Sequence, residues 1–167
     1  MTLLIYLLVM ITSFLGLLIG IIISNIAIEE ITHASKYLKF LNIILVPIIV
    51  LLATFQINRL YSIIFASIIL ITLIISRKKY NDAWIYASMS ALLYVATISQ
   101  ELLDVASLIF VYGISIATIN ASTHFKKKIN RQARFKENVL LIKKIFCKYS
   151  YYLIIGIIFF VVFSYIL

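Results

Sequence analysis

Six long apolar stretches, separated by short polar ones, account for most of the 167-residue chain. The shortest of them contain 17 residues, and a helix of that length extends about 26 Å, enough to cross a thin hydrocarbon core. The pattern therefore predicts an all-α membrane protein, a single domain built as a bundle of six transmembrane helices. The predicted helices are 3–28, 40–57, 60–76, 83–99, 105–121 and 149–167.

Only Asn58 and Arg59 separate the second and third apolar stretches. Pro47 lies inside the second stretch, where a proline removes a backbone hydrogen bond and bends a helix. We interpret the pair as two full crossings, and a re-entrant pair that returns to the side it entered from is the alternative. The charge pattern does not distinguish them, because both place the following helices on the same sides.

The positions of the basic residues predict the orientation. Fourteen of the 15 lysine and arginine residues fall in the first, third and fifth loops, and only Arg59 falls in another. Loops that stay in the cytoplasm are enriched in Lys and Arg, so the net charge of +9 needs no nucleic-acid partner. The sequence predicts a multi-pass protein of the cell membrane, with both termini outside and the basic loops in the cytoplasm.

The composition supports this class and excludes others. Hydrophobic residues make up 64% of the chain, charged residues only 13%, and the mean hydropathy is +1.13, whereas soluble domains carry about 25% charged residues. The single cysteine, Cys147, excludes a disulfide scaffold. Four glycines and one proline are too few for the turns of a membrane β-barrel.

Small residues at four-residue spacing form flat strips on two predicted helices. Gly16 and Gly20 make a G-x-x-x-G motif in the first helix, and Gly113, Ala117 and Ala121 repeat the spacing in the fifth. Such strips let two helix backbones approach closely. We expect them to pack helices within one chain, and dimerisation through the first helix is the alternative.

One group of residues has the spacing of metal ligands. Glu29, Glu30 and His33 follow the first helix, and a continuing helix would place carboxylate and imidazole on one face. His124, the only other histidine, lies beside a lysine run that repels a divalent cation. The glutamates also have a simpler partner in Lys36. We therefore predict no metal, no cofactor and no catalytic residue, with these four residues as the only metal candidates.

The segment after the first helix carries a resemblance. Residues 26–31 read I-A-I-E-E-I and residues 36–38 read K-Y-L, after a helix with a G-x-x-x-G motif. This arrangement resembles a group of small uncharacterised archaeal polytopic membrane proteins, in which the first helix ends in an A-x-E-E-type string. Ala34 and Ser35 stand where that group tends to have glycine. The similarity covers about 40 residues and implies an archaeal source without implying an activity.

Residues 122–148 form a basic segment before the last helix. On a helical wheel Phe135, Val139, Ile142 and Phe146 share one face. This predicts a basic amphipathic interfacial helix on the inner leaflet, where its cations meet anionic lipids. An acidic protein or RNA is the alternative partner, but no recognition fold or stacking motif supports nucleic acid. The cations expected at the lipid surface are Lys126, Lys127, Lys128, Arg131 and Arg134.

Three functions are compatible with the sequence. The favoured one is a non-enzymatic membrane subunit or scaffold, which binds further copies of itself or another membrane protein, because no predicted helix carries a charge at its centre. The first alternative is a transporter or channel for a small solute, lined by serine and threonine. The second is a membrane enzyme that uses Glu29, Glu30 and His33 at the cytoplasmic interface.

Overall fold

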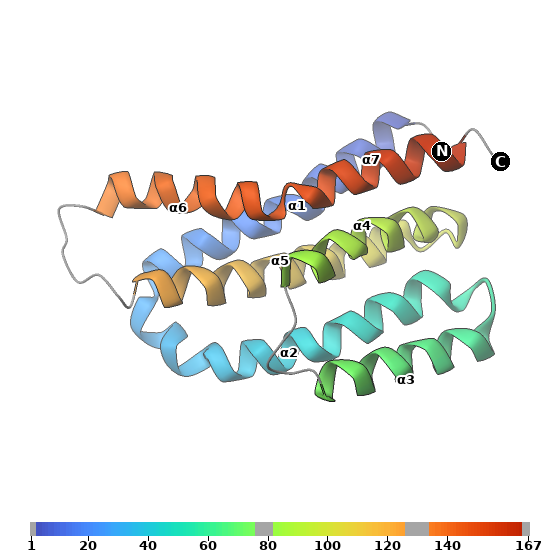
Figure 1. Ribbon diagram of the computed structural model, residues 1–167, viewed down its shortest axis with the longest axis horizontal. Helices are drawn as coiled ribbons and strands as arrows, with labels where there is room; N and C mark the ends of the chain where they lie inside the picture. Colours follow the sequence, from blue (N-terminus) through green and yellow to red (C-terminus); the bar gives the residue numbers. More distant parts are fainter. Residues whose placement is uncertain (1–2, 76–81, 126–133, 165–167) are drawn as a thin grey trace.

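The computed structural model describes the backbone of residues 3–75, 82–125 and 134–164. Helices form nearly all of this part of the chain (Figure 1). An all-helical fold is therefore confirmed for the described residues. The helices are α1 (Leu3–Ile26), α2 (Ile28–Phe55), α3 (Arg59–Ile75), α4 (Asp82–Ile98), α5 (Leu102–Phe125), α6 (Arg134–Tyr149) and α7 (Tyr151–Ser164).

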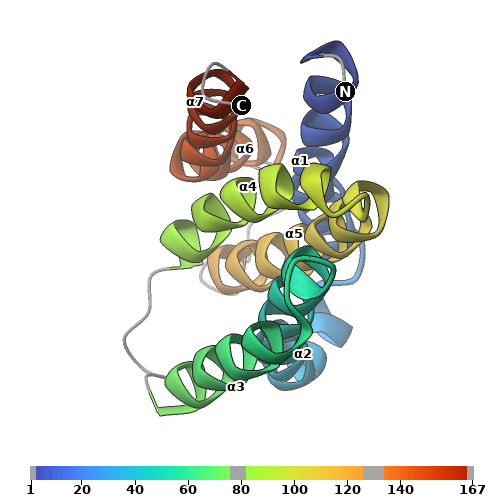
Figure 2. The ribbon, with the colours of Figure 1, turned by 90° about the vertical axis from the view of Figure 1, so that its right-hand side faces the viewer.

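The helices lie side by side along the long direction of the molecule. α4 and α5 occupy the middle, with α1, α6 and α7 on one side and α2 and α3 on the other (Figures 1 and 2). α5 contacts α1 and α2 most extensively, whereas α3 packs mainly against α2. The beginning of α1 and the end of α7 lie at the same end of the bundle (Figure 1).

Four helical segments in the described part of the chain are long and apolar enough to cross a membrane. The last of them runs from the second half of α6 through α7, while α3 and α4 are apolar but shorter, with 17 residues each. The structure is therefore that of a helical bundle with four candidate membrane spans, and the count of six spans stays a prediction. The four segments are Leu3–Ile26, His33–Phe55, Leu102–Ser122 and Ile142–Val162.

α2 begins much earlier than the sequence pattern predicts. The predicted helix starts at residue 40, but α2 starts at Ile28, so the segment taken as a loop is helical. Residues 29–39 contain neither glycine nor proline, so nothing in them ends a helix. Only Ala27, with φ −117° and ψ 48°, separates α1 from α2. The polar residues after the first apolar stretch consequently lie on the first turns of α2.

Two other boundaries differ from the prediction. α5 is longer at both ends than the predicted helix 105–121. Part of the predicted loop 122–148 is helical, because α6 covers its second half and only Ser150 separates α6 from α7. The basic amphipathic segment before the last helix is thus a helix where it is described, and its location on a membrane leaflet stays a prediction.

A tight connection joins α2 to α3. The Asn58 Oδ1 atom accepts hydrogen bonds from the backbone N–H groups of Leu60 and Tyr61, over 3.2 and 3.3 Å. An asparagine in this position caps the start of the next helix. This explains why two residues between apolar stretches suffice to reverse the chain.

The connection between α4 and α5 lies beside this hairpin. Gln56 Nε2 donates a hydrogen bond to Glu101 Oε1 over 3.4 Å, and Gln100, two residues after the end of α4, has a positive φ of 62°. The Arg59 guanidinium lies over the Phe55 ring, 5.3 Å from its centroid. Polar contacts therefore join the two connections at this end of the bundle.

Tyrosines and small hydroxyl side chains fill the interior together with aliphatic residues. Tyr6, Tyr86, Tyr149 and Tyr152 are almost completely buried. Tyr94 and Tyr112 are also buried, and the remaining buried polar side chains in the described part of the chain are serine or threonine. Most of their hydroxyls donate to a carbonyl three or four residues earlier in the same helix, which satisfies them locally.

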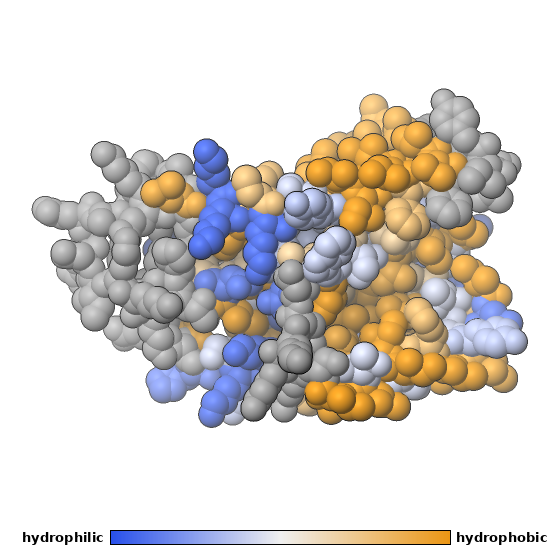
Figure 3. Space-filling model, in the orientation of Figure 1, coloured by the Kyte–Doolittle hydropathy of each residue, from blue (hydrophilic) through white to orange (hydrophobic). Residues whose placement is uncertain are grey.

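The surface changes in character along the molecule. Hydrophilic residues gather at the end where α2 begins, and hydrophobic residues cover most of the other end (Figure 3). On α3 only Ser62, Ala66 and Leu73 are buried, and most of its other large aliphatic side chains are exposed. An exposed apolar surface of this extent is typical of a protein surrounded by lipid.

Candidate functional site

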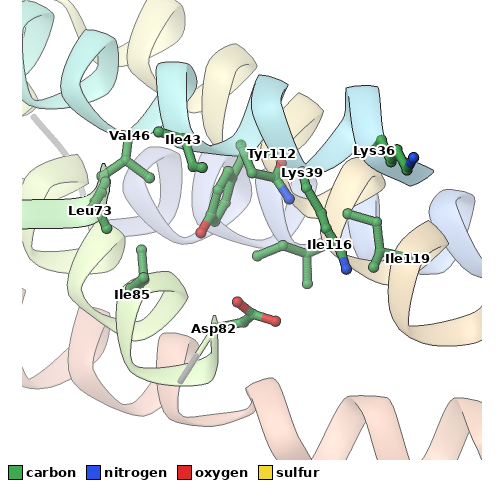
Figure 4. Close-up of a pocket in the computed structure, with 11 residues that line it drawn as sticks. Lys36, Lys39, Ile43, Val46, Leu73, Asp82, Ile85, Tyr112, Ile116 and Ile119 are labelled. Carbon is green, nitrogen blue, oxygen red and sulfur yellow. The ribbon is translucent and has the colours of Figure 1, made fainter. Parts of the chain in front are cut away.

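A cavity of about 520 Å³ lies between α2, α4 and α5, near the start of α4 (Figure 4). Its volume falls within the range of about 300–1,000 Å³ that is typical of small-molecule sites. The residues that line it are Lys36, Lys39, Asn42, Ile43, Val46, Leu73, Asp82, Ile85, Tyr112, Ile116 and Ile119.

The cavity is charged at one end and apolar at the other. Lys36 and Lys39 lie on the early turns of α2, and Ile43 and Val46 follow on the same side of the helix (Figure 4). Residues 36 and 46 are separated by about 15 Å along a helix. A ligand that filled the cavity would meet ammonium groups at one end and hydrocarbon at the other.

Asp82 adds a negative charge to the polar end. It is the first residue of α4 and precedes the apolar stretch of that helix. Its carboxylate and the Lys39 ammonium extend into the same space (Figure 4). Burial raises the pKa of the Asp82 carboxyl above its ordinary value, whereas the positive charges of Lys148 and Lys39 lower it. The polar end therefore holds both signs of charge, with cations in excess.

Asn42, one of the residues that line the cavity, has a side-chain oxygen without a hydrogen-bond donor. Its Oδ1 atom is buried and has no hydrogen-bond partner among the described residues. Buried polar atoms in folded proteins are nearly always hydrogen-bonded. Because this oxygen has almost no accessible surface, it lies behind the wall of the cavity, and a ligand in the cavity does not reach it.

Tyr112 forms the inner wall of the cavity, and other tyrosines stand behind it. Its ring stacks on Tyr86 with centroids 6.2 Å apart. Tyr86 in turn contacts the rings of Tyr149 and Tyr152, at 5.5 and 4.8 Å. Tyr149 is held in place by Asn120, whose Nδ2 donates to the tyrosine hydroxyl over 2.9 Å.

The cavity ends near the middle of the bundle. Val46, Ile85 and Tyr112 are its innermost lining residues on α2, α4 and α5. About one helical turn beyond these residues, away from the polar end, each helix has a fully buried residue: Ile49 on α2, Met89 on α4 and Ile109 on α5. The cavity is therefore open at the polar end and closed by packed side chains at the apolar end.

The small-residue strip of α1 faces α5. A Cβ atom added at Gly16 would meet the backbone of Phe110. One added at Gly20 would meet the Ile114 carbonyl and come within 2.8 Å of the Ala117 Cβ. Only glycine permits such an approach, so this geometry favours packing within the chain over the alternative of a dimer through α1.

The strip of α5 completes the same contact. A Cβ at Gly113 would lie 3.3 Å from the Leu17 backbone nitrogen. Ala117 and Ala121 are fully buried, and the Thr118 hydroxyl between them donates to the Gly20 carbonyl over 3.1 Å. The structure thus brings four of the predicted packing residues, Gly16, Gly20, Gly113 and Ala117, to the contact between α1 and α5, and Ala121 is buried on α5.

The two candidate metal ligands whose side chains are described do not line the cavity. Glu30 and His33 are exposed on the first turns of α2, and the side chains of Glu29 and His124 lie outside the described residues. Within the described part of the chain, no three His, Cys, Asp or Glu side chains gather in a metal-binding group. The absence of bound metal therefore stays a prediction.

The second half of α6 packs against the bundle. Lys143 and Lys144 are exposed while Ile145 is buried. The Phe146 ring meets the Phe14 ring edge to face, 4.8 Å between centroids. This half therefore contacts α1 and α4 and does not lie on lipid alone. The cations predicted to bind the lipid surface have side chains outside the described residues: Lys126, Lys127, Lys128, Arg131 and Arg134.

Sequence reasoning missed the cavity. It placed Lys36, Lys39 and Asp82 in loops between the predicted helices. The available signal was the run 36, 39, 43 and 46, whose spacing of three and four residues places them on one side of a helix. Comparison with known proteins gives no match, whether to a family model, a curated protein or a solved structure. The function is therefore inferred from the cavity and the packing.

Proposed function

We propose that this protein is a non-enzymatic subunit or scaffold of the cell membrane, crossing it six times with both termini outside. The observation that carries the proposal is the packed middle of the bundle. Large side chains from α1, α2, α4 and α5 are fully buried there, among them Leu17, Ile49, Leu93 and Ile109. Close packing of this kind closes the inner end of the cavity in the described part of the chain, which favours a subunit or scaffold over an open channel.

The hydroxyl side chains agree with this proposal. A pathway for ions or protons normally has a titratable residue within the span. In the part of the chain that the structure describes, the buried polar side chains besides tyrosine are serine and threonine, and most of them donate to a carbonyl three or four residues earlier. Local hydrogen bonds explain most of these positions without a solute, and Ser24 is the exception, because its hydroxyl is buried without a partner.

The orientation is supported by the distribution of charge on the bundle. The hydrophilic end is the one where α2 begins (Figure 3), and it carries Lys36 and Lys39. The chain's first and last described helices meet at the opposite end (Figure 1). An even number of crossings and a cytoplasmic basic end produce this arrangement. α3 and α4, with 17 residues each, span about 26 Å.

A transporter for a small, weakly polar solute is the second candidate. The cavity favours it, because its open polar end and closed apolar end are the form expected of a carrier captured facing one side. The membrane enzyme is not proposed, since Glu30 and His33 do not line the cavity.

Reconstitution into lipid vesicles separates the two candidates. Vesicle swelling would be followed after addition of glycerol, urea or a sugar, with protein-free vesicles as the control. A subunit or scaffold leaves the permeability unchanged. A saturable flux that Ile116→Trp abolishes by filling the cavity would reject the subunit and establish the transporter.

A size measurement tests the subunit directly. The protein would be released gently from the membranes that normally contain it and its mass determined in detergent. A subunit or scaffold is expected in a discrete complex larger than one 19.1 kDa chain. A monomer in intact membranes, established by cross-linking before solubilisation, would contradict the proposal.

A further inference from the structure

We propose that the cavity between α2, α4 and α5 binds a phospholipid whose headgroup carries a hydrogen-bond donor besides its phosphate, as an ethanolamine or glycerol headgroup does. The proposal does not depend on the scaffold function, because a bound lipid is compatible with a subunit and with a transporter. It rests on the charges at the open end of the cavity and on its apolar wall.

The phosphate is assigned to the two lysines. Lys36 and Lys39 are three residues apart, so they lie on one side of α2, and both line the open end of the cavity. Ammonium groups form charge-assisted hydrogen bonds with phosphate oxygens. Asp82 neutralises part of this positive charge. Lys148 adds a further positive charge that acts on the Asp82 carboxylate, so the cations outnumber the carboxylate.

The donor is assigned to Asp82. A fully ionised phosphodiester offers acceptors only, so it would bring a second negative group toward the Asp82 carboxylate at the polar end of the cavity. An ammonium or hydroxyl group on the same headgroup supplies a donor to this carboxylate. A headgroup of mixed character therefore matches the mixed charge of the cavity, and a choline headgroup, which has no donor, does not.

The hydrocarbon chain is assigned to the inner part of the cavity. Ile43, Val46, Leu73 and Ile85 form an apolar wall that continues from the lysines toward the closed end. α4 begins near the middle of the long axis (Figure 1), where hydrophilic surface gives way to hydrophobic surface (Figure 3). Headgroups lie at such a boundary in a membrane, so the polar end of the cavity is at the depth of lipid headgroups.

The test is thermal unfolding of the purified full-length protein in a non-ionic detergent with short-chain lipids added. The probes are dioctanoyl phosphatidylethanolamine, dioctanoyl phosphatidylglycerol and dioctanoyl phosphatidylcholine, together with phosphoethanolamine, which has no chain. The ethanolamine and glycerol lipids are expected to raise the melting temperature saturably. The choline lipid should require a concentration higher by about tenfold. Phosphoethanolamine alone should have no effect.

Variants locate the effect. Lys36→Ala with Lys39→Ala should weaken the response to both active lipids by about tenfold or more, and Asp82→Asn should remove the preference for ethanolamine over choline. Lys143→Ala with Lys144→Ala changes two exposed lysines outside the cavity and should leave the response intact.

Three results would overturn the proposal. The first is an equal response to the choline and ethanolamine lipids in the unmodified protein. The second is a response that survives loss of Lys36 and Lys39, since those variants alter exposed residues and should fold normally. The third is a full response to phosphoethanolamine, which would assign the cavity to a water-soluble ligand instead of a lipid.

Discussion

The Tyr152 hydroxyl of α7 lies 2.6 Å from the Ser13 hydroxyl of α1, which joins the last helix to the first. Ser13 donates its own proton to the Met10 carbonyl over 2.8 Å, so Tyr152 is the donor in the contact between the helices. Both residues are buried. The bond fixes the position of α7 against α1 deep inside the bundle.

Tyr152→Phe is expected to destabilise the protein modestly. The ring and its contact with Tyr86 remain, and Ser13 keeps its bond to Met10, so only one hydrogen bond is lost, at about 0.5–1.5 kcal/mol. Thermal unfolding in detergent measures the loss. Tyr151→Phe is the matched control, because the neighbouring Tyr151 is 57% exposed.

The same pair allows a double-mutant cycle. Ser13→Ala and Tyr152→Phe should couple by about 0.6 kcal/mol, the average for hydrogen bonds between membrane helices. Additive effects, or an equal loss in Tyr151→Phe, would show that the contact does not stabilise the bundle.

Gly16→Ile combined with Gly20→Ile is expected to disrupt the packing of α1 on α5. The new side chains would collide with the backbone of Phe110 and Ile114, and overpacking of this kind costs about 1–3 kcal/mol per site. The melting temperature in detergent should fall by several degrees. Thr12→Ile introduces the same side chain at an exposed position of α1 and should change little.

The oligomeric state separates the two uses of this strip. If the glycines serve packing within the chain, the double variant loses stability and its oligomeric state is unaffected. A double variant with an unchanged melting curve but a smaller oligomer would establish dimerisation through α1.

Cysteine labelling tests the predicted orientation. In a Cys147→Ser background, needed because the native thiol is exposed, Thr2→Cys and Asn58→Cys should react with a membrane-impermeant reagent from outside. Asn81→Cys and Asn130→Cys should react only after the membrane is opened. Labelling of the residue 130 variant in intact cells would reverse the orientation and remove the cytoplasmic assignment of the basic loops.

Elemental analysis tests the prediction that the protein binds no metal. Glu30 and His33 are exposed and lie apart from the cavity, and a stable metal site needs three or four ordered ligands. Purified protein should therefore contain no stoichiometric transition metal. About one metal ion per chain, lost in His33→Ala, would contradict this prediction and return the enzyme hypothesis to consideration.

The sequence alone determined that the chain is helical and apolar and which end of the bundle is basic. These properties are local, because hydropathy and the absence of helix breakers act within one segment. The same reasoning placed the start of the second helix at residue 40, because it followed hydropathy. The chain between 29 and 39 is polar, but it contains nothing that stops a helix, so α2 begins at Ile28.

The tertiary structure alone decided which residues meet. Lys39, Asp82 and Tyr112 lie on three different helices and share one cavity, and Gly16 packs against α5. In a soluble protein the apolar side of a helix identifies its buried side. In a membrane protein the lipid and the protein interior are equally apolar. The buried side and the outward side of a helix such as α3 are therefore similarly hydrophobic, and the hydropathy pattern does not distinguish them. The pairing of faces is therefore set by the close fit between helices, which a hydropathy pattern does not encode.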